Sequence, residues 1–333
     1  MAEYINIKGQ SIEVVASDPA NPTVGQIWYN STSNTLKGQG YQAAAWASGG
    51  NLNTARYLGA GAGTQTAALL SAGATPGNFS SNATEEYNGA TWTSSGTVGA
   101  QRFALGGFGT QTAGLIFGGE GPGIGYTGAT EAYNGSTWSP VNPMNTARYK
   151  IATSGVGTQT AGLCVAGNTD GATTTGATEE YDGTSWATSG SLNTPREQGV
   201  AFGIQTAGLC CAGLFAPPVV FYAATEEYNG TSWTSVNSMN TARAAGAGAG
   251  IQTAGLAFGG SDSSPAVTAA TEEYDGTSWT NTTNLPAATN NVNGGAGTET
   301  AGLIFGGQVS GTATAGTFAY TGAGPVTKTI TAS

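Results

Sequence analysis

The chain has 333 residues, of which 39% are hydrophobic and 8% charged, and its formal net charge is −10. The apolar content is enough to bury a core, so the 55 glycines do not indicate disorder. The acidity, together with nine scattered basic residues, argues against nucleic acid or an anionic membrane as a direct partner.

Histidine is absent from the sequence, which excludes histidine-dependent acid–base catalysis and catalytic triads. Cys164, Cys210 and Cys211 have neither a disulfide framework nor metal-ligand spacing, and we interpret them as small core residues. The first residues lack a charged stretch followed by an apolar one, and no apolar run is long enough to span a membrane. We therefore expect no cofactor, no metal site, no membrane insertion, and folding in a cytoplasm.

Residues 1–40 precede the repeats described below. Within them, "GQIWYN" (25–30) and "TLKGQ" (35–39) flank a four-residue turn. Two strand-like runs around a short turn predict a β-hairpin. We expect this segment to be separate from the rest of the chain.

An internal repeat dominates the remaining sequence. The signature "GTQTAGLIFGG" at 109–119 has related copies that start at 63, 157, 203, 250 and 297, spaced 46 to 48 residues apart. The tryptophans keep the same step along the chain: Trp46, Trp92, Trp138, Trp186, Trp233 and Trp279. Two independent signatures in one phase identify a structural repeat.

Each period predicts four short strands. A small-residue segment is followed by an apolar run such as "AGLIFGG", which is typical of a strand buried on both faces. An alternating "ATEEY" segment, an Asn-Gly or Asp-Gly turn and a strand that starts at the Trp come next. Four antiparallel strands per period indicate a β-propeller blade.

These features resemble the kelch repeat, in which a buried strand ends in Gly-Gly and a Tyr, a Trp and an Arg follow in fixed order. The resemblance covers residues 41–322, with Ala-Gly in place of Gly-Gly at 72, 166 and 212. It implies an all-β, six-bladed propeller of four-stranded antiparallel blades. Because Trp46 has no buried strand before it and Tyr320 has no Trp after it, we expect the N- and C-terminal segments to pair in one blade and close the ring. Residues 323–333 are then a C-terminal tail.

Five repeats carry a Glu two residues before the Tyr and an Arg ten residues after the Trp, whereas the sixth has Phe318 and Thr289 there. The joint loss of both charges points to a structural ion pair, because a lone buried charge is costly. We predict ion pairs, within a blade or between adjacent blades, among Arg56, Glu85, Arg102, Glu131, Arg148, Glu179, Arg196, Glu226, Arg243 and Glu272. The second glutamates, Glu86, Glu180, Glu227 and Glu273, are expected to face solvent, and the Trp and Tyr rings to pack between blades.

The loops between the second and third strands differ in every repeat, while the turns on the opposite face are nearly invariant. Diversity on a rigid scaffold is how a binding face is built. Loop 214–223 is unusually apolar, so it either folds over the ring mouth or a neighbouring blade, or contacts a partner protein. Phe79 and Tyr126 also suit stacking on a glycan. The candidate binding residues are Phe79, Tyr126, Leu214, Phe215, Val219, Val220, Phe221 and Tyr222.

Catalytic chemistry has little support in the sequence. Kelch-type propellers include galactose oxidase, whose copper site needs histidine ligands that this chain lacks. Glu120, Asp170 and Asp262 lie in loops of the same type and could meet on the rim, where a weak Ca²⁺ site is the alternative to solvated charge. We interpret the chain as non-enzymatic, with no catalytic residue.

The segment "NPTVGQIWYNSTSNTLK" (21–37) resembles N-terminal modules of bacteriophage tail-fibre and other virion structural proteins, and the "NTAR" and "GTQTAG" repeats resemble kelch-repeat proteins of marine phages. The resemblance implies a virion protein, assembled in a bacterial host cytoplasm, whose residues 1–40 attach it to other virion proteins. The variable face is expected to bind a host-surface glycan or protein, or a neighbouring virion protein. The alternatives are a capsid or tail decoration with no receptor role and, third, a carbohydrate-active enzyme. Whether the chain forms a homo-oligomer stays open.

Overall fold

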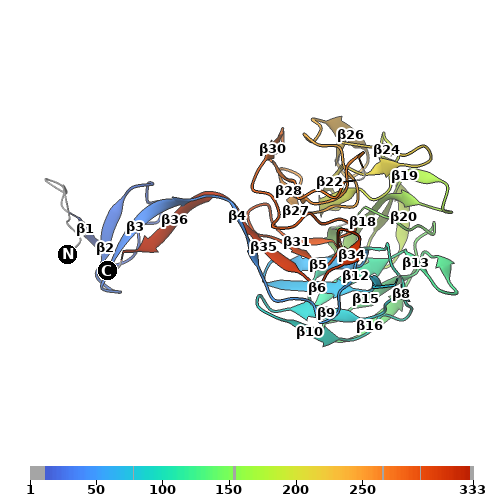
Figure 1. Cartoon of the computed structure of the whole chain (residues 1–333), viewed down its shortest axis with the longest axis horizontal. Coiled ribbons are helices and arrows are strands. Elements are labelled where there is room, and N and C mark those ends of the chain that lie inside the picture. The colour runs from blue at the N-terminus through green and yellow to red at the C-terminus, as the bar shows by residue number, and fades with distance from the viewer. Residues whose placement is uncertain (1–11, 78, 153–154, 265, 293, 331–333) are drawn as a thin grey trace. The chain divides into compact units, whose positions relative to one another are not determined.

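The computed structural model describes residues 12–77, 79–152, 155–264, 266–292 and 294–330, so residues 1–11 of the predicted N-terminal segment lie outside the description. The described residues form strands and turns, and they include no helix long and apolar enough to cross a membrane. The chain divides into two compact units, shown in Figure 1. Unit 1 holds residues 1–45 and 322–333, and unit 2 holds Trp46–Thr321.

Unit 1 contains one four-stranded sheet built from both ends of the chain. Its strands, in order across the sheet, are β1 (Glu13–Val15), β2 (Ile27–Asn30), β3 (Thr35–Gln42) and β36 (Gly324–Thr329). The strands β2 and β3 form the predicted antiparallel hairpin. The last strand pairs with β3 from Lys37↔Thr329 to Gln42↔Gly324. Residues 324–329, expected as part of a tail, therefore complete this sheet.

The Asp18 carboxylate ties the loop before β2 to this sheet. It accepts hydrogen bonds from Trp28 Nε1 at 3.0 Å and Asn30 Nδ2 at 2.7 Å, and it forms a 2.6 Å ion pair with Lys37 Nζ. These contacts, that of Lys37 first, lower the pKa of Asp18 to about 2. The hydrogen-bonded indole of Trp28 is fully buried, so unit 1 has a core residue of its own.

Unit 2 contains, within its described residues, six sheets of four strands each. The first sheet consists of β5 (Ala60–Thr64), β6 (Ala67–Ser71), β9 (Thr84–Tyr87) and β10 (Trp92–Ser95). The second consists of β11 (Gly106–Thr110), β12 (Ala113–Phe117), β15 (Thr130–Tyr133) and β16 (Trp138–Val141). The third consists of β17 (Val156–Thr158), β18 (Ala161–Asn168), β19 (Thr174–Tyr181) and β20 (Trp186–Ser189).

The other three sheets repeat this order. The fourth consists of β21 (Val200–Ile204), β22 (Ala207–Cys211), β25 (Thr225–Tyr228) and β26 (Trp233–Val236). The fifth consists of β27 (Ala247–Ile251), β28 (Ala254–Phe258), β29 (Thr271–Tyr274) and β30 (Trp279–Asn281). The sixth consists of β31 (Gly295–Gly297), β32 (Gly302–Phe305), β35 (Thr317–Thr321) and β4 (Ala45–Ser48). A strand from residue 45 thus lies beside strands from residues 295–321.

The local sequence explains the strand pairing. In each repeat the apolar second strand is the most buried, as in β12, and it lies between the first and third strands. The turn between the third and fourth strands is held by its first residue. In the fourth sheet, Asn229 Oδ1 accepts the N–H groups of Thr231 and Ser232 at 3.0 and 2.9 Å. This side-chain turn ends the third strand and starts the fourth in register.

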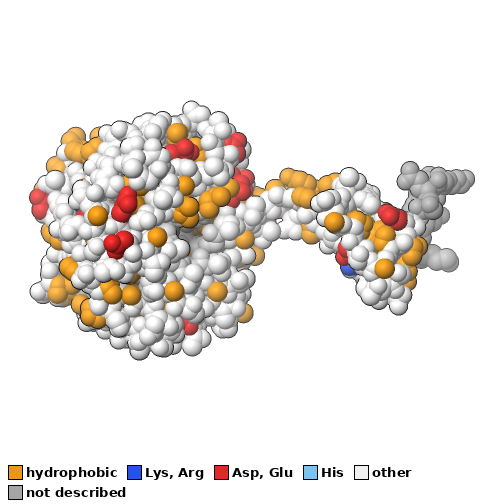
Figure 2. All heavy atoms as spheres, turned by 180° about the vertical axis from the view of Figure 1, so that it is seen from behind, with side chains coloured by type: hydrophobic (Ala, Val, Ile, Leu, Met, Phe, Trp, Pro, Cys, Tyr) orange, Lys and Arg blue, Asp and Glu red, His pale blue; other side chains and the backbone are white. Residues whose placement is uncertain are grey.

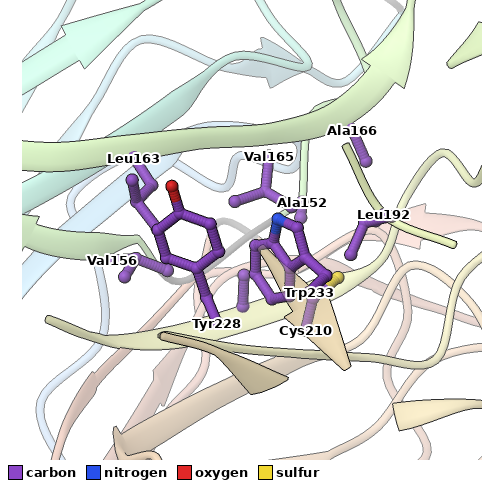
Figure 3. Close-up of a cluster of buried hydrophobic side chains, with 10 residues drawn as sticks. Ala152, Val156, Leu163, Val165, Ala166, Leu192, Cys210, Tyr228 and Trp233 are labelled. Atoms are coloured by element: carbon purple, nitrogen blue, oxygen red, sulfur yellow. The ribbon is translucent and has the colours of Figure 1, made fainter. Parts of the chain in front are cut away.

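The cores lie between neighbouring sheets. Figure 3 shows the ring of Tyr228 and the indole of Trp233, from the fourth sheet, against side chains such as Val156, Leu163 and Val165 of the third. Burial of each ring contributes on the order of 2 kcal/mol, and the Trp233 Nε1–H also donates to Thr178 Oγ1 of the third sheet at 3.0 Å. Equivalent indole-to-threonine bonds are made by Trp92, Trp138, Trp186 and Trp279. The aromatic residues of the repeat therefore join one sheet to the next.

Candidate functional site

The predicted Arg–Glu partners lie together in the structure. Arg56 Nη2 is 2.7 Å from Glu85 Oε1, and its Nη1 donates to the carbonyl oxygens of Ala72 and Ala83. The other carboxylate oxygen of Glu85 accepts the N–H of Asn53 at 2.7 Å. The same pairing joins Arg102–Glu131 at 2.7 Å, Arg148–Glu179 at 2.8 Å, Arg196–Glu226 at 2.6 Å and Arg243–Glu272 at 3.4 Å.

Each of these pairs connects the segment before a sheet's first strand with the third strand of that same sheet. Of the two arrangements considered from the sequence, the structure has the one within a sheet. The arginines are buried, and burial lowers the pKa of Arg56, Arg102 and Arg243 while the paired carboxylate opposes the shift. Groups enclosed in this way hold the frame and are not accessible to a ligand.

The second glutamates do not face open solvent, so that expectation was wrong. Each is partly buried and accepts a hydrogen bond from the tyrosine hydroxyl of the next sheet, as Glu227 does from Tyr274 at 2.9 Å. The same bond joins Tyr133 to Glu86, Tyr228 to Glu180 and Tyr320 to Glu273. Burial, and then the Glu86 carboxylate, raise the pKa of the Tyr133 hydroxyl to about 12.

A further link between sheets was not foreseen from the sequence. The Gln of each "GTQT" or "GIQT" turn reaches the preceding sheet, where Gln111 Nε2 donates to the carbonyl oxygens of Ala68 and Tyr87 at 3.1 and 2.6 Å. Gln65 makes the equivalent bonds to Gly302 and Tyr320, and so joins the first sheet to the sixth. The recurrence of this Gln in five of the six repeats was the signal that could have revealed it.

The variable loops are mostly ordered hairpins. Four of them contain two-stranded ribbons, namely β7 (Ala74–Thr75) with β8 (Phe79–Ser80), β13 (Glu120–Gly121) with β14 (Gly125–Tyr126), β23 (Leu214–Phe215) with β24 (Val220–Phe221), and β33 (Gln308–Val309) with β34 (Thr312–Ala313). In the third sheet β18 and β19 themselves extend into the loop. These loops therefore present their tips from defined bases.

The predicted binding residues fall into two groups. Phe79, Val219 and Val220 are exposed, at 71%, 63% and 44%. The remaining candidates, Tyr126, Leu214, Phe215, Phe221 and Tyr222, are partly buried.

Loop 214–222 is anchored at its base and exposed at its tip. Thr174 Oγ1 of the third sheet donates to the carbonyl oxygen of Ala216 at 2.9 Å, and the Arg196 guanidinium lies 5.7 Å from the Tyr222 ring centroid. Leu214 pairs with Phe221 across the ribbon. The tip residues Val219 and Val220 remain free to meet a partner, because they are the exposed ones.

The centre of the same face is formed by the two residues that follow each Arg position. We call these residues the rim: Tyr57–Leu58, Phe103–Ala104, Tyr149–Lys150, Glu197–Gln198, Ala244–Ala245 and Asn290–Asn291. The first residue of each pair bridges the start of its variable loop, as Tyr57 does with Ala74. The second residue has a left-handed backbone in all six pairs, with φ between 48 and 59°. The rim and the loops thus form one continuous surface.

Two features of this face could receive a ligand. A groove of about 270 Å³, lined by residues that include Tyr57, Pro76, Gln308 and Thr312, lies between the loops of the first and sixth sheets. The second feature is a polar cluster to which the second, third and fourth repeats contribute. We call it the Lys150 corner: Tyr126, Tyr149, Lys150, Asn168 and Glu197.

The Lys150 corner is a connected network. Lys150 Nζ lies 2.8 Å from Glu197 Oε1 and 5.3 Å from the Tyr149 ring centroid, and Asn168 Nδ2 donates to Glu197 Oε2 at 2.7 Å. Tyr126 stacks on Tyr149 with centroids 4.5 Å apart and planes at 20°. Burial, and then the neighbouring Tyr126, raise the pKa of the Tyr149 hydroxyl. Of the predicted residues only Tyr126 belongs to this cluster.

The loop acids do not assemble into a metal site. The carboxylate of Asp170 accepts the N–H groups of Ala172 and Thr173, and that of Asp262 accepts the N–H and hydroxyl of Ser264; these bonds lower the pKa of both acids. No group of three or more His, Cys, Asp or Glu side chains in the described ranges is placed to hold a metal ion. The cluster of loop acids considered from the sequence is therefore absent from this part of the chain.

A separate cavity of about 130 Å³ lies among the first strands, at the end near the "GTQT" turns. The equivalent glycine of every sheet helps to line it: Gly63, Gly109, Gly157, Gly203, Gly250 and Gly297. The backbone approaches closely here, because a Cβ on Gly157 would lie 2.2 Å from the carbonyl oxygen of Ala161. A cavity walled largely by backbone offers no titratable side chain for catalysis.

No protein-family model matches this chain, and no curated protein matches it. Among solved structures it is similar to the one described as "Structure of YjhT", with a TM-score of 0.67 and 12% sequence identity. The match covers 83% of this chain and 99% of that chain. At this identity the likeness concerns the fold. Together with the four-stranded antiparallel sheets, it is consistent with a β-propeller.

Proposed function

We propose that this chain is a non-enzymatic phage virion protein whose six-bladed kelch-type propeller presents a variable binding face. Each of the six sheets of unit 2 is one blade in this proposal, and β4 completes the sixth. The first strands lie side by side in a cycle, from β5 through β11, β17, β21, β27 and β31 and back to β5, which supports a closed ring.

Backbone hydrogen bonds around the rim also support closure. In four blades, the second residue of the rim pair donates its N–H to the carbonyl oxygen of the second residue of the preceding blade's pair. The donors are Ala104, Lys150, Gln198 and Ala245, at 2.7 to 2.9 Å. Leu58 N–H donates to Asn291 O at 3.0 Å, and Val292 N–H donates to Ala245 O at 3.5 Å. The circuit returns to its start, so every blade contributes one link.

The observation that carries the binding function is the position of the exposed apolar side chains. Six large hydrophobic residues are exposed in the described part of unit 2, and four of them, Phe79, Ile124, Val219 and Val220, lie in the variable loops. The scaffold beneath keeps its repeated arginines buried. Apolar tips on ordered hairpins are typical of a surface that meets a partner.

The virion setting comes from residues 21–37, which resemble the attachment modules of tail fibres. Unit 1 would join the particle through other virion proteins, and the loop face would bind a host-surface receptor or a neighbouring virion subunit. Decoration of the capsid or tail without a receptor role is the alternative proposal.

Binding of the labelled full-length chain to a panel of intact bacterial strains tests the receptor role. The loop variant Val219→Ser/Val220→Ser removes the exposed tip. The matched control is Ile204→Thr/Ile251→Thr, which changes two exposed residues at the far ends of β21 and β27 from the variable loops. Threonine is the residue that the chain already has at the equivalent positions, Thr64 and Thr110. Saturable binding that the loop variant loses and the control keeps would support the proposal. No saturable binding to any strain by the folded chain would overturn the receptor role in favour of decoration.

A further inference from the structure

The rim offers an internal comparison, because the same two positions occur six times in one chain. The positions equivalent to Lys150 hold Leu58, Ala104, Gln198, Ala245 and Asn291, and every one has the same left-handed backbone. The hydrogen-bonded circuit forms equally through Ala104, Ala245 and Lys150. The rim therefore does not need a charge at Lys150.

Glu197 departs from the repeat in the same way. The fifth sheet has Ala244 at the equivalent position, with the same backbone bridge to the start of its loop. The Glu197 side chain is 2% exposed, so burying its carboxylate costs solvation free energy. The alanine at position 244 has no such cost. Lys150, whose side chain keeps 32% exposure, compensates that buried charge. The fifth sheet forms with alanines at the equivalent positions and without a buried charge, which points to a role of Lys150 and Glu197 other than folding.

Lys150 is also unusual among the basic residues of unit 2. The remaining ones are the five buried arginines, so Lys150 is the only basic side chain of unit 2 with substantial exposure. Its ammonium has three donors, and one of them meets the Glu197 Oε1 atom at 2.8 Å. The side chain lies beside the buried ring of Tyr149, and the partly buried Tyr126 that stacks on this ring adds aromatic surface near a hydrogen-bond donor.

The charges of the corner argue against an anionic ligand. Glu197 already balances Lys150, and Glu120 lies close enough to act on Tyr149. Figure 2 shows acidic side chains scattered over the opposite view of unit 2, on which no basic side chain is visible. Between the rim residues lies a cavity of about 10 Å³ that Lys150, Gln198 and Asn291 help to line, which is room for one water-sized group. A ligand here would be neutral, rich in hydroxyl groups and bound mainly on the surface.

We infer that the Lys150 corner is a binding site for a neutral saccharide, with the ammonium of Lys150 offering polar contacts and the ring of Tyr126 offering an aromatic surface. The other three members, Tyr149, Asn168 and Glu197, are buried and hold these two side chains in place. The inference rests on the proposed function, since it assigns a ligand class to the same face. It concerns a different part of that face from the apolar tip at Val219 and Val220, so the two can fail separately.

Saturation-transfer NMR on the full-length chain tests this inference, with glucose, galactose, mannose and N-acetylglucosamine as probes. Glucuronic and galacturonic acid are the matched anionic probes, because they are glucose and galactose with a carboxylate in place of the C6 hydroxymethyl group. The test variants are Tyr126→Ala and the double variant Lys150→Ala/Glu197→Ala. The double variant gives the corner the residues of Ala245 and Ala244, whereas loss of Lys150 alone would leave Glu197 buried without its ion pair.

We expect at least one neutral sugar to bind, both variants to weaken it at least tenfold, and the corresponding uronic acid to bind at least tenfold more weakly. Unfolding temperatures should show that the double variant folds. Absence of transfer to every neutral sugar, unchanged binding by the folded double variant, or preference for the uronic acid would each overturn the inference. Loss of cell binding in the Val219→Ser/Val220→Ser variant, with sugar binding intact, would separate the two proposals.

Discussion

The first five sheets of unit 2 and the sixth share one strand order but not the same bonds. The five contain a buried Arg–Glu pair, whereas the sixth has Thr289 and Phe318 at those positions. The sixth sheet also has Ala319 where most of the others have a second Glu, and Glu299 where the others have Gln. It nevertheless forms, with Trp46 packed against Phe258 and Tyr320 at centroid distances of 5.3 and 5.0 Å. Aromatic packing and the backbone ladder are therefore sufficient for the sheet.

The comparison also separates what a buried ion pair adds from what it costs. Removing both charges, as in the sixth sheet, leaves no uncompensated group, while removing one leaves a charge without its partner in a buried site. The five pairs should therefore appear indispensable in single variants and much less so in double variants.

The largest effect is expected when one partner of a pair is removed. Arg148→Ala should lower the free energy of unfolding by about 3–5 kcal/mol, because Glu179 then stays buried and unpaired. The double variant Arg148→Thr/Glu179→Phe places the residues of the sixth sheet in the third and should recover part of that loss. Urea denaturation followed by tryptophan fluorescence measures both, with Thr289→Ala as a control that removes no charge. Equal losses in the single and double variants would contradict the comparison.

A smaller effect is expected at the tyrosine that joins neighbouring sheets. Tyr274→Phe removes the hydroxyl that donates to Glu227 at 2.9 Å and should cost about 1.5–3 kcal/mol, as for a hydrogen bond to a charged group. Tyr181 is the matched control within the chain, because it packs against Ala132 in place of a second Glu. Tyr181→Phe should stay within about 0.5 kcal/mol of the parent. Similar costs for the two substitutions would remove the role assigned to the second glutamates.

Much of the fold and of its ion pairs could be predicted from the sequence, because the six repeats can be compared with one another. The spacing of the tryptophans and the apolar runs indicated the strands, and the joint loss of Arg and Glu in one repeat indicated that they are partners. The strand pairing of residues 324–329 with β3 was not predicted, since "GPVTKT" has neither apolar alternation nor a turn signal that assigns it to a sheet.

The candidate site was harder to predict than the fold. Exposure at Phe79, Val219 and Val220 follows from loop composition, and those residues were identified. Tyr149, Lys150 and Asn168 belong to the third repeat and Glu197 to the fourth. They were missed as a group because they meet only when adjacent sheets pack. Comparison of each rim position across the repeats would have marked Lys150 and Glu197 as departures, but not as neighbours.

The smallest expected effect concerns the glutamine that links each sheet to the preceding one. Gln252 Nε2 donates to the carbonyl oxygens of Gly208 and Tyr228 at 3.1 and 2.9 Å, and Glu299 stands at the equivalent place in the sixth sheet. An ionised carboxylate has no proton to donate to a carbonyl. Burial, followed by the Glu273 and Asp275 carboxylates, raises the pKa of Glu299, and Tyr320 is the other titratable group that interacts with it.

Because the folded state raises this pKa, the contribution of Glu299 to stability is present in full below its unfolded pKa of about 4.3 and is lost as pH rises through the folded value. Glu299→Gln should therefore stabilise the protein at pH 7, by about 1 kcal/mol for a neutral hydrogen bond, and by less at pH 4. Thermal unfolding at the two pH values measures the difference, and Gln252→Glu should show the opposite sign at pH 7. A gain from Glu299→Gln that is equal at both pH values would mean that ionisation of this carboxylate does not weaken the sixth sheet. The difference between the five sheets and the sixth would then lie in the Arg–Glu pairs and the second glutamates alone.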